Sequence, residues 1–400
     1  MPIKPRRWWG APTKFDDRRY ERKVSWLELF YDLVYVAAIS QLTHHIAAHP
    51  SWGSITFSFL LFSLLFWSWI NGSQYYDLHG SEGVRTRLIT FWQMLAVAAV
   101  AITLNDAFEG NHKSFAVAFA CLQVMITWLW FSVGFYDPSH RKYSIYYTVL
   151  YLFALALLLI SIFTSSSTAT WLWIAVLVLN VSPPIALLPL MFRIRKETGQ
   201  EFSLSATIVE RFGLFTIIVL AESILATVTG IAEVKDKLPS AWVAFILSIL
   251  ISFLLWSIYF DMTSEQEAKP GYINMQWYII LHFPLLASLG VIGACLKYML
   301  LHMEGGVSEM IQWMFCAAVA MILVTTVTVT SLLKEDEEVR SYVRPLRPLL
   351  IVLSVIILLI PPTNLIKDTV LFLSVIGVIL LIPIIYGVIR WSRFRAEHDI

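Results

Sequence analysis

The chain has 400 residues, of which 58% are hydrophobic and 14% are charged, and its formal net charge is +1. A soluble domain is about half apolar and about a quarter charged, so this composition excludes an ordinary soluble protein. We expect an integral membrane protein in contact with the lipid bilayer, with no nucleic-acid partner. Its three cysteines fall singly inside apolar runs and no CxxC or Cys/His ligand spacing occurs, so neither a disulfide nor a structural zinc site is expected. We also expect no other metal and no cofactor.

Apolar runs of about 20 residues are long enough to cross a bilayer as helices. We predict twelve such helices, at 26–47, 52–73, 88–107, 114–135, 144–163, 169–191, 207–231, 240–261, 274–298, 307–333, 345–362 and 367–390. Only the stretches 74–87, 192–206, 262–273 and 334–344 are long enough to be substantial loops. The predicted fold class is therefore an all-α membrane protein without a soluble domain.

The distribution of Lys and Arg predicts the orientation of the chain. With the N-terminus inside, 23 of the 29 basic residues fall on cytoplasmic segments and five on the opposite side, while Arg211 begins a span. Basic residues concentrate on the cytoplasmic side of membrane proteins. Both termini are therefore expected in the cytoplasm.

Two patterns recur in the second half of the chain. Ser25-Trp-Leu-Glu28 opens the first helix and Thr207-Ile-Val-Glu210 opens the seventh, while S-x-x-x-W-S occurs at 63–68 and again at 252–257. We therefore predict two six-helix repeats of the same orientation, related by a pseudo-two-fold axis along the membrane normal. The predicted segments are a basic tail (1–25), the first repeat (26–191), a linker (192–206), the second repeat (207–390) and a C-terminal tail (391–400).

The first helix carries two carboxylates, Glu28 and Asp32, although ionisable groups inside a membrane are costly and usually face a bundle interior or a water path. Glu28 and Glu210 each end an [ST]-x-x-E pattern, which predicts a capping box at the helix start or a place at a pathway mouth. Asp32 lies one turn deeper and shares a face with Glu28 and Tyr35. A structural ion pair and a cation- or proton-handling role both fit Asp32.

The seventh helix carries Arg211 and, near mid-membrane, Glu222, about 16 Å apart along the axis. Each needs a partner elsewhere, and we expect Asp32, Asp77 or Asp261 for Arg211 and His282 for Glu222. His282 precedes Pro284, which can kink a helix, so this histidine fits either a proton-coupled hinge or simple packing.

Other polar residues mark helix ends. Asp77 and Asp261 end the second and eighth predicted helices at the cytoplasmic face and, with Tyr35, are candidates for a cytoplasmic mouth. The spacing of His44, His45 and His49 would permit a metal, but we expect none there. Pro183-Pro184 predicts a break in the sixth helix, of the kind that lines sites in transporters.

Three motifs, SWLELFYDLVYVAAISQL, VERFGLFTIIVLAESILA and HFPLL, resemble the bacterial low temperature requirement A family over essentially the whole chain. The resemblance implies a multi-pass protein of the bacterial inner membrane. The first helix is also similar to the Phe-Ser-Asp signature of the endosomal and lysosomal potassium and proton channels. Phe30 and Asp32 match that signature, whereas Tyr31 replaces its serine and Ala37 replaces its bulky gate residue.

The buried carboxylates favour a transporter or channel that moves a cation or a proton-coupled solute along a path lined by the first and seventh helices. The residues expected to handle the ion or proton are Asp32, Glu222, Glu28, Glu210, Arg211 and His282. A sensor or scaffold without transport is the main alternative. An enzyme that modifies lipids, with His282 as general base, is a further alternative that no recognised motif supports. A homodimer is compatible with the sequence.

Overall fold

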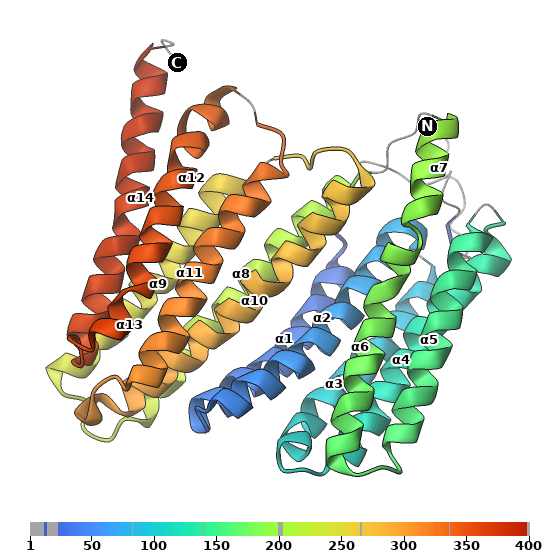
Figure 1. Ribbon diagram of the computed structural model, residues 1–400, viewed down its shortest axis with the longest axis horizontal. Helices are drawn as coiled ribbons and strands as arrows, with labels where there is room; N and C mark the ends of the chain where they lie inside the picture. Colours follow the sequence, from blue (N-terminus) through green and yellow to red (C-terminus); the bar gives the residue numbers. More distant parts are fainter. Residues whose placement is uncertain are drawn as a thin grey trace. The chain divides into compact units, whose positions relative to one another are not determined.

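Figure 1 shows the computed structural model of the chain, which describes residues 12–13, 23–81, 83–138, 140–198, 203–264, 266–335 and 337–397. Most of the predicted basic tail, residues 1–25, lies outside these ranges. Twelve helices of 21 residues or more occur within them: α1 (Trp26–Ala48), α2 (Trp52–His79), α3 (Val84–Phe108), α4 (His112–Tyr136), α5 (Arg141–Ser161), α6 (Ser166–Ala186), α8 (Ala206–Glu233), α9 (Pro239–Thr263), α10 (Tyr272–Leu301), α11 (Glu309–Ser331), α12 (Glu337–Leu358) and α14 (Thr369–Glu397). Two shorter α-helices are α7 (Leu188–Thr198) and α13 (Ile360–Thr363).

The described helices confirm an all-α membrane protein. Eleven stretches are long and apolar enough to cross a bilayer, and every long helix except α1 falls in one of them. In lipid a helix satisfies its backbone hydrogen bonds within itself, which is why apolar runs of this length become helices. The 23 residues of α1 would span about 34 Å at 1.5 Å per residue, so polar residues, and not shortness, exclude it from the eleven.

The chain divides into two compact units, and the structure describes each by itself. Unit 1 comprises residues 1–42 and 56–211, and unit 2 comprises residues 43–55 and 212–400. In unit 1, α4 packs between α3 and α5, and α5 packs against α6. In unit 2, α11 packs against α10 and α12, while α14 packs against α9 and α12. The internal repeat, with its boundaries, stays a prediction.

Several boundaries differ from the sequence prediction. The loop predicted at 74–87 is wrong at its start, because α2 continues to His79 and buries Tyr75 and Tyr76. The predicted linker 192–206 begins inside α7, and α14 continues through most of the predicted C-terminal tail to Glu397. The proline pair Pro183-Pro184 lies in the last turn of α6, and the regular helix is interrupted at Leu187 before α7 begins.

The core of unit 1 contains polar side chains that bond one another. Gln123 of α4 and Asn180 of α6 exchange amide hydrogen bonds of 3.0 and 3.1 Å. The hydroxyl of Tyr151 donates to the side-chain oxygen of Asn71. Because polar groups away from water are costly unless paired, such pairs help fix which helix faces meet.

Candidate functional site

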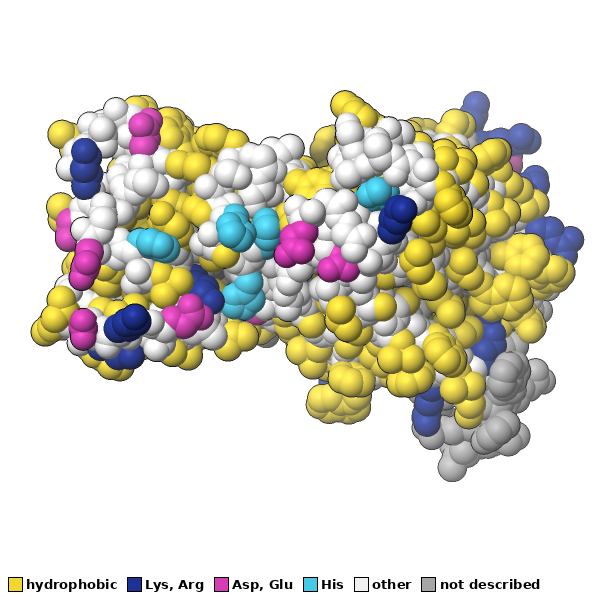
Figure 2. All heavy atoms as spheres, turned by 90° about the horizontal axis from the view of Figure 1, so that it is seen from below, with side chains coloured by type: hydrophobic (Ala, Val, Ile, Leu, Met, Phe, Trp, Pro, Cys, Tyr) yellow, Lys and Arg dark blue, Asp and Glu magenta, His cyan; other side chains and the backbone are white. Residues whose placement is uncertain are grey.

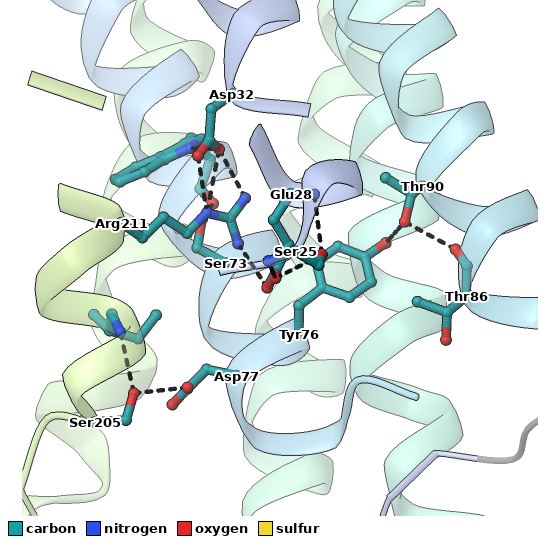
Figure 3. A network of polar contacts seen from close by, with 12 residues as sticks. Ser25, Glu28, Asp32, Ser73, Tyr76, Asp77, Thr86, Thr90, Ser205 and Arg211 are labelled. Atoms are coloured by element: carbon teal, nitrogen blue, oxygen red, sulfur yellow. Dashed lines mark hydrogen bonds and ion pairs between the residues drawn. The ribbon is translucent and has the colours of Figure 1, made fainter. Parts of the chain in front are cut away.

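A buried ion pair joins α1 to the start of α8 in unit 1 (Figure 3). The guanidinium of Arg211 donates from Nη2 to Oδ1 of Asp32 at 2.7 Å, and from Nε to both carboxylate oxygens at 3.2 and 3.1 Å. Arg211 is 1% exposed and Asp32 is 0% exposed. The sequence prediction that Asp32 is a partner of Arg211 is confirmed, in the form of a two-point contact with fixed geometry.

Glu28 adds a second carboxylate to the same guanidinium. Its Oε1 lies 3.5 Å from Nη1 of Arg211. Its Oε2 accepts from the backbone N–H and the hydroxyl of Ser25 at 2.9 and 2.8 Å, and the N–H of Glu28 reaches Oγ of Ser25 at 3.3 Å. The predicted capping box is therefore confirmed at α1. One cation thus faces two carboxylates, so the cluster carries one net negative charge when all three groups are ionised.

Aromatic side chains enclose this cluster. Nε1 of Trp69 donates to Oδ1 of Asp32 at 2.6 Å, and the guanidinium of Arg211 lies 5.4 Å from the centre of the Tyr31 ring. The hydroxyls of Tyr31 and Tyr35 are 3.1 Å apart, and Tyr35 also contacts Oγ of Ser68 at 3.1 Å. Tyr35, a candidate for the cytoplasmic mouth, is 1% exposed. These contacts hold the ion pair away from lipid and bulk water.

Ser205 is the N-cap residue that precedes α8, and its contacts correct the prediction of the second capping box. The backbone N–H of Ile208 donates to Oγ of Ser205 at 3.1 Å, and the Ser205 hydroxyl donates to Oδ1 of Asp77 at 2.7 Å. The predicted Thr207-to-Glu210 capping box is wrong, because Thr207 already lies inside the helix and Glu210 is exposed. Asp77 therefore positions the residue that caps α8.

Unit 2 contains a second polar chain, which involves the C-terminal end of α1, the second half of α8 and α10. Oε1 of Glu222, a residue 4% exposed, lies 4.0 Å from Nε2 of His44. Nδ1 of His44 lies 3.4 Å from Nζ of Lys297, which donates to Glu233 at 2.9 Å. Figure 2 looks onto this end of the unit and shows histidine and charged side chains among hydrophobic ones. A chain of ionisable groups therefore connects a buried carboxylate to the surface.

His282 has different partners from the one predicted. Nδ1 of His282 lies 2.7 Å from the carbonyl of Tyr278, and its Nε2 lies 2.8 Å from the hydroxyl of Tyr259. Since a carbonyl only accepts, Nδ1 carries the proton and Nε2 accepts from Tyr259. The predicted pairing of Glu222 with His282 is wrong because both ring nitrogens are already occupied. Helix α10 continues through Pro284 without a break.

Asp261 lies at the mouth of a cavity of about 340 Å³ in unit 2, formed by the ends of α9, α12 and α14. One carboxylate oxygen accepts from Ser257 at 2.6 Å, and the Asp261 carbonyl lies 3.2 Å from the hydroxyl of Tyr342. The rest of the lining is mainly apolar, and Asp261 itself is exposed. This aspartate is therefore placed differently from Asp77, although the sequence pattern treats them alike.

The sequence analysis missed one group with ligand chemistry. Within the described residues, His79, Asp137 and His140 of unit 1 offer three ligand atoms that lie within 4.8 Å of one another. His79 ends α2, and the other two flank the α4–α5 turn. No local motif signals the group, since its members come from separate parts of the chain.

The chain is similar to known bacterial proteins. The chain is 27% identical over 285 residues to an uncharacterized protein of Rhizobium meliloti (strain 1021), an alignment that covers 67% of this chain and 68% of the relative. No solved structure matches the chain. Residues 23–384, which contain both polar clusters on α1 and α8, match the bacterial low temperature requirement A protein family. The chain belongs to that family.

Proposed function

We propose that this protein is a transporter or channel of the bacterial inner membrane, which moves a cation or a proton-coupled solute along a path lined by α1 and α8. We infer from the distribution of Lys and Arg that both termini face the cytoplasm. One observation carries the proposal. The buried carboxylate of Glu222 contacts His44, whose side chain is 34% exposed, and the contacts continue through Lys297 to the exposed Glu233.

The tautomer of His44 makes this contact suitable for proton transfer. The ammonium of Lys297 can only donate, so Nδ1 of His44 accepts from it. Nε2 of the neutral ring then carries its proton and faces the carboxylate of Glu222 at 4.0 Å, which is longer than a hydrogen bond, so the two groups must approach each other for the proton to pass. An imidazole that gives a proton from one nitrogen and gains one at the other can relay it between water and a buried acid. Carboxylates and histidines inside membranes commonly form such relays.

Within this proposal Asp32 and Arg211 have a positioning role. Their contact is buried and is held further by Trp69 and by Glu28, so it resembles a fixed ion pair more than an ion-binding site. The pair joins α1 to α8 near one end of both helices. We assign Glu222, in the middle of α8, and His44, near the C-terminal end of α1, to the moving proton.

The same fixed pair favours the second candidate, a membrane sensor or scaffold without transport. A buried ion pair that is held in place by protein contacts serves assembly as well as it serves permeation. The lipid-modifying alternative receives less support, because the ring nitrogens of His282 both bond within the protein and its side chain is 0% exposed.

Flux measurements in proteoliposomes decide between these candidates. The purified protein is reconstituted with a pH-sensitive dye inside the vesicles, and gradients of H⁺, Na⁺ and K⁺ are imposed in turn. We expect Glu222→Gln and His44→Gln each to lower proton-coupled flux at least about tenfold, as loss of a positioned proton-transfer group does. Glu304→Gln, a change at an exposed carboxylate of the 3₁₀-helix Met303–Gly305, is the control and should leave flux unchanged.

Two results would count against the proposal. Flux that is equal in the wild type and in both variants would remove Glu222 and His44 from the path. Flux no faster than in empty vesicles for all three cations, from protein that is monodisperse and folded, would favour the sensor or scaffold.

A further inference from the structure

The three ligand-type residues at one end of unit 1 lie in a fixed frame. His79 is the last residue of α2, and Asp137 and His140 border a tight turn between α4 and α5. The N–H of Asp137 donates to the carbonyl of Val133 at 2.8 Å, and the N–H of His140 donates to the carbonyl of Asp137 at 3.2 Å. His79 and Asp137 are each 1% exposed, and His140 is half-buried. The backbone therefore determines where the three side chains converge.

The tautomer of His79 leaves Nε2 as a hydrogen-bond acceptor. Nδ1 of His79 lies 2.9 Å from the carbonyl oxygen of Thr13 and must donate to it. Nε2 then carries a lone pair and faces Nδ1 of His140 at 3.3 Å. A ring N–H bonded to a backbone carbonyl is the arrangement that orients most metal-binding histidines.

The distance between the two facing ring nitrogens of His79 and His140 fits a shared metal ion. With Zn–N bonds of about 2.0–2.1 Å and tetrahedral angles, two coordinated nitrogens lie about 3.3–3.4 Å apart. The observed distance of 3.3 Å between Nδ1 of His140 and Nε2 of His79 agrees with this value. A carboxylate oxygen of Asp137 lies within 4.8 Å of both nitrogens, close enough to be offered as a third ligand.

We propose that His79, Asp137 and His140 bind a divalent transition-metal cation of the zinc class, with the hydrogen bond between the two rings replaced by two metal–nitrogen bonds. Two neutral imidazoles and one carboxylate form a ligand set that zinc accepts, and the remaining coordination position takes water or an anion. Zinc would also fix the ring of His79 against Thr13, whose N–H and hydroxyl donate to the carbonyls of His79 and Gly80 at 3.0 and 2.8 Å. The site thereby connects a residue of the N-terminal segment to α2 and to the α4–α5 turn.

Metal binding to the purified full-length protein tests this proposal. Protein without a polyhistidine tag is stripped with a chelator in detergent and titrated with Zn²⁺ against a fluorescent zinc chelator. We expect one equivalent of tight binding in the wild type, and a fall in affinity of about 100-fold or more in His140→Ala and in Asp137→Asn. These losses exceed the 10–100-fold that changes beyond the ligands themselves typically cause. The control is His302→Ala, at an exposed histidine after α10, which should bind as the wild type does.

Cobalt gives a second readout that does not depend on affinity. Co²⁺ in a four-coordinate site of this kind absorbs strongly in the visible range, whereas six-coordinate Co²⁺ does not. We expect the wild type and His302→Ala to develop this absorption and His140→Ala to lack it while it elutes as a folded protein. Unchanged Zn²⁺ affinity in both ligand variants, or equal loss in the His302 control, would overturn the assignment.

Discussion

Replacement of Asp32 by asparagine tests whether the buried ion pair stabilises unit 1. Asparagine retains one side-chain oxygen, which can still accept from Trp69 and from Nη2 of Arg211. Its amide nitrogen, however, then occupies the position of Oδ2 and faces Nε of Arg211, which is 3.1 Å from that atom in the wild type. Two donors would point at each other. The guanidinium would remain buried, and among the described residues only Glu28, at 3.5 Å, would still oppose its charge.

The size of the effect follows from the burial of the partner that remains. Breaking a buried ion pair by removal of one charge costs about 3–5 kcal/mol, because it leaves the other charge uncompensated. Arg211 is 1% exposed, so water cannot replace the lost carboxylate without a structural change. At about 2–4 °C per kcal/mol for a domain of 150–250 residues, Asp32→Asn should lower the melting temperature by roughly 6–20 °C.

Thermal unfolding in detergent, followed through tryptophan fluorescence, measures this shift. Arg211→Gln alone should destabilise to a similar degree. The double variant Asp32→Asn/Arg211→Gln should lose less than the sum, because it removes both charges of the pair and the remaining carboxylate, Glu28, keeps its bonds to Ser25. Asp236→Asn, at an exposed aspartate in the α8–α9 turn, is the control and should change stability by at most about 0.5 kcal/mol. If Asp32→Asn melted within 2 °C of the wild type, or if the two single effects simply added, the reasoning would be refuted.

Three further variants test single contacts by the same unfolding measurement. Gly72→Ala would place a Cβ 2.3 Å from the hydroxyl of Tyr31, so overpacking should destabilise by about 1–3 kcal/mol, whereas no change would mean that the ring moves freely. Ser205→Ala removes the N-cap of α8 and should cost about 1 kcal/mol, with Ser205→Asp expected to retain most of the capping. Burial raises the pKa of Glu335, but hydrogen bonds and charges from the arginines of α12, Arg347 among them, outweigh it and hold the pKa below its ordinary value of 4.5. The stability that Glu335→Gln removes should therefore be present in full above pH 4.5 and shrink as the pH falls through the lowered pKa, and a difference that instead grew in acid would contradict this assignment.

Hydropathy and helix length account for most of what could be predicted of the fold. Runs of apolar residues located every long helix because a bilayer allows few alternatives to a helix. The ends were less certain where aromatic residues occur. Tyr75 and Tyr76 resemble an interfacial belt in the sequence, but both are buried inside unit 1, and α2 therefore extends to His79.

Contacts within a helix turn were more predictable than contacts between helices. The bond between Ser25 and Glu28 follows from their three-residue spacing. Arg211 needed a carboxylate partner, and the sequence offers few carboxylates near the same depth. Glu222 shows the limit, since the spacing places it on a helix face but does not say which helix lies opposite. Its neighbour is His44, a residue that hydropathy had placed at an outer helix end.

Helix α1 is less apolar than the eleven stretches that could cross a bilayer, and it carries several of the buried ionisable residues described above. Glu28, Asp32 and His44 lower the mean hydropathy of α1, but Glu28 and Asp32 are buried against Arg211 and are not exposed to lipid. A helix whose charges are matched by neighbouring protein does not need the apolar excess that a lipid-facing helix needs. Low hydropathy in a helix of spanning length is therefore informative here, because it identifies a helix whose acidic side chains are buried against protein. Helix α8 also contributes ionisable residues, namely Arg211, Glu222 and Glu233, but it is apolar enough to count as a candidate span because long apolar stretches separate these residues.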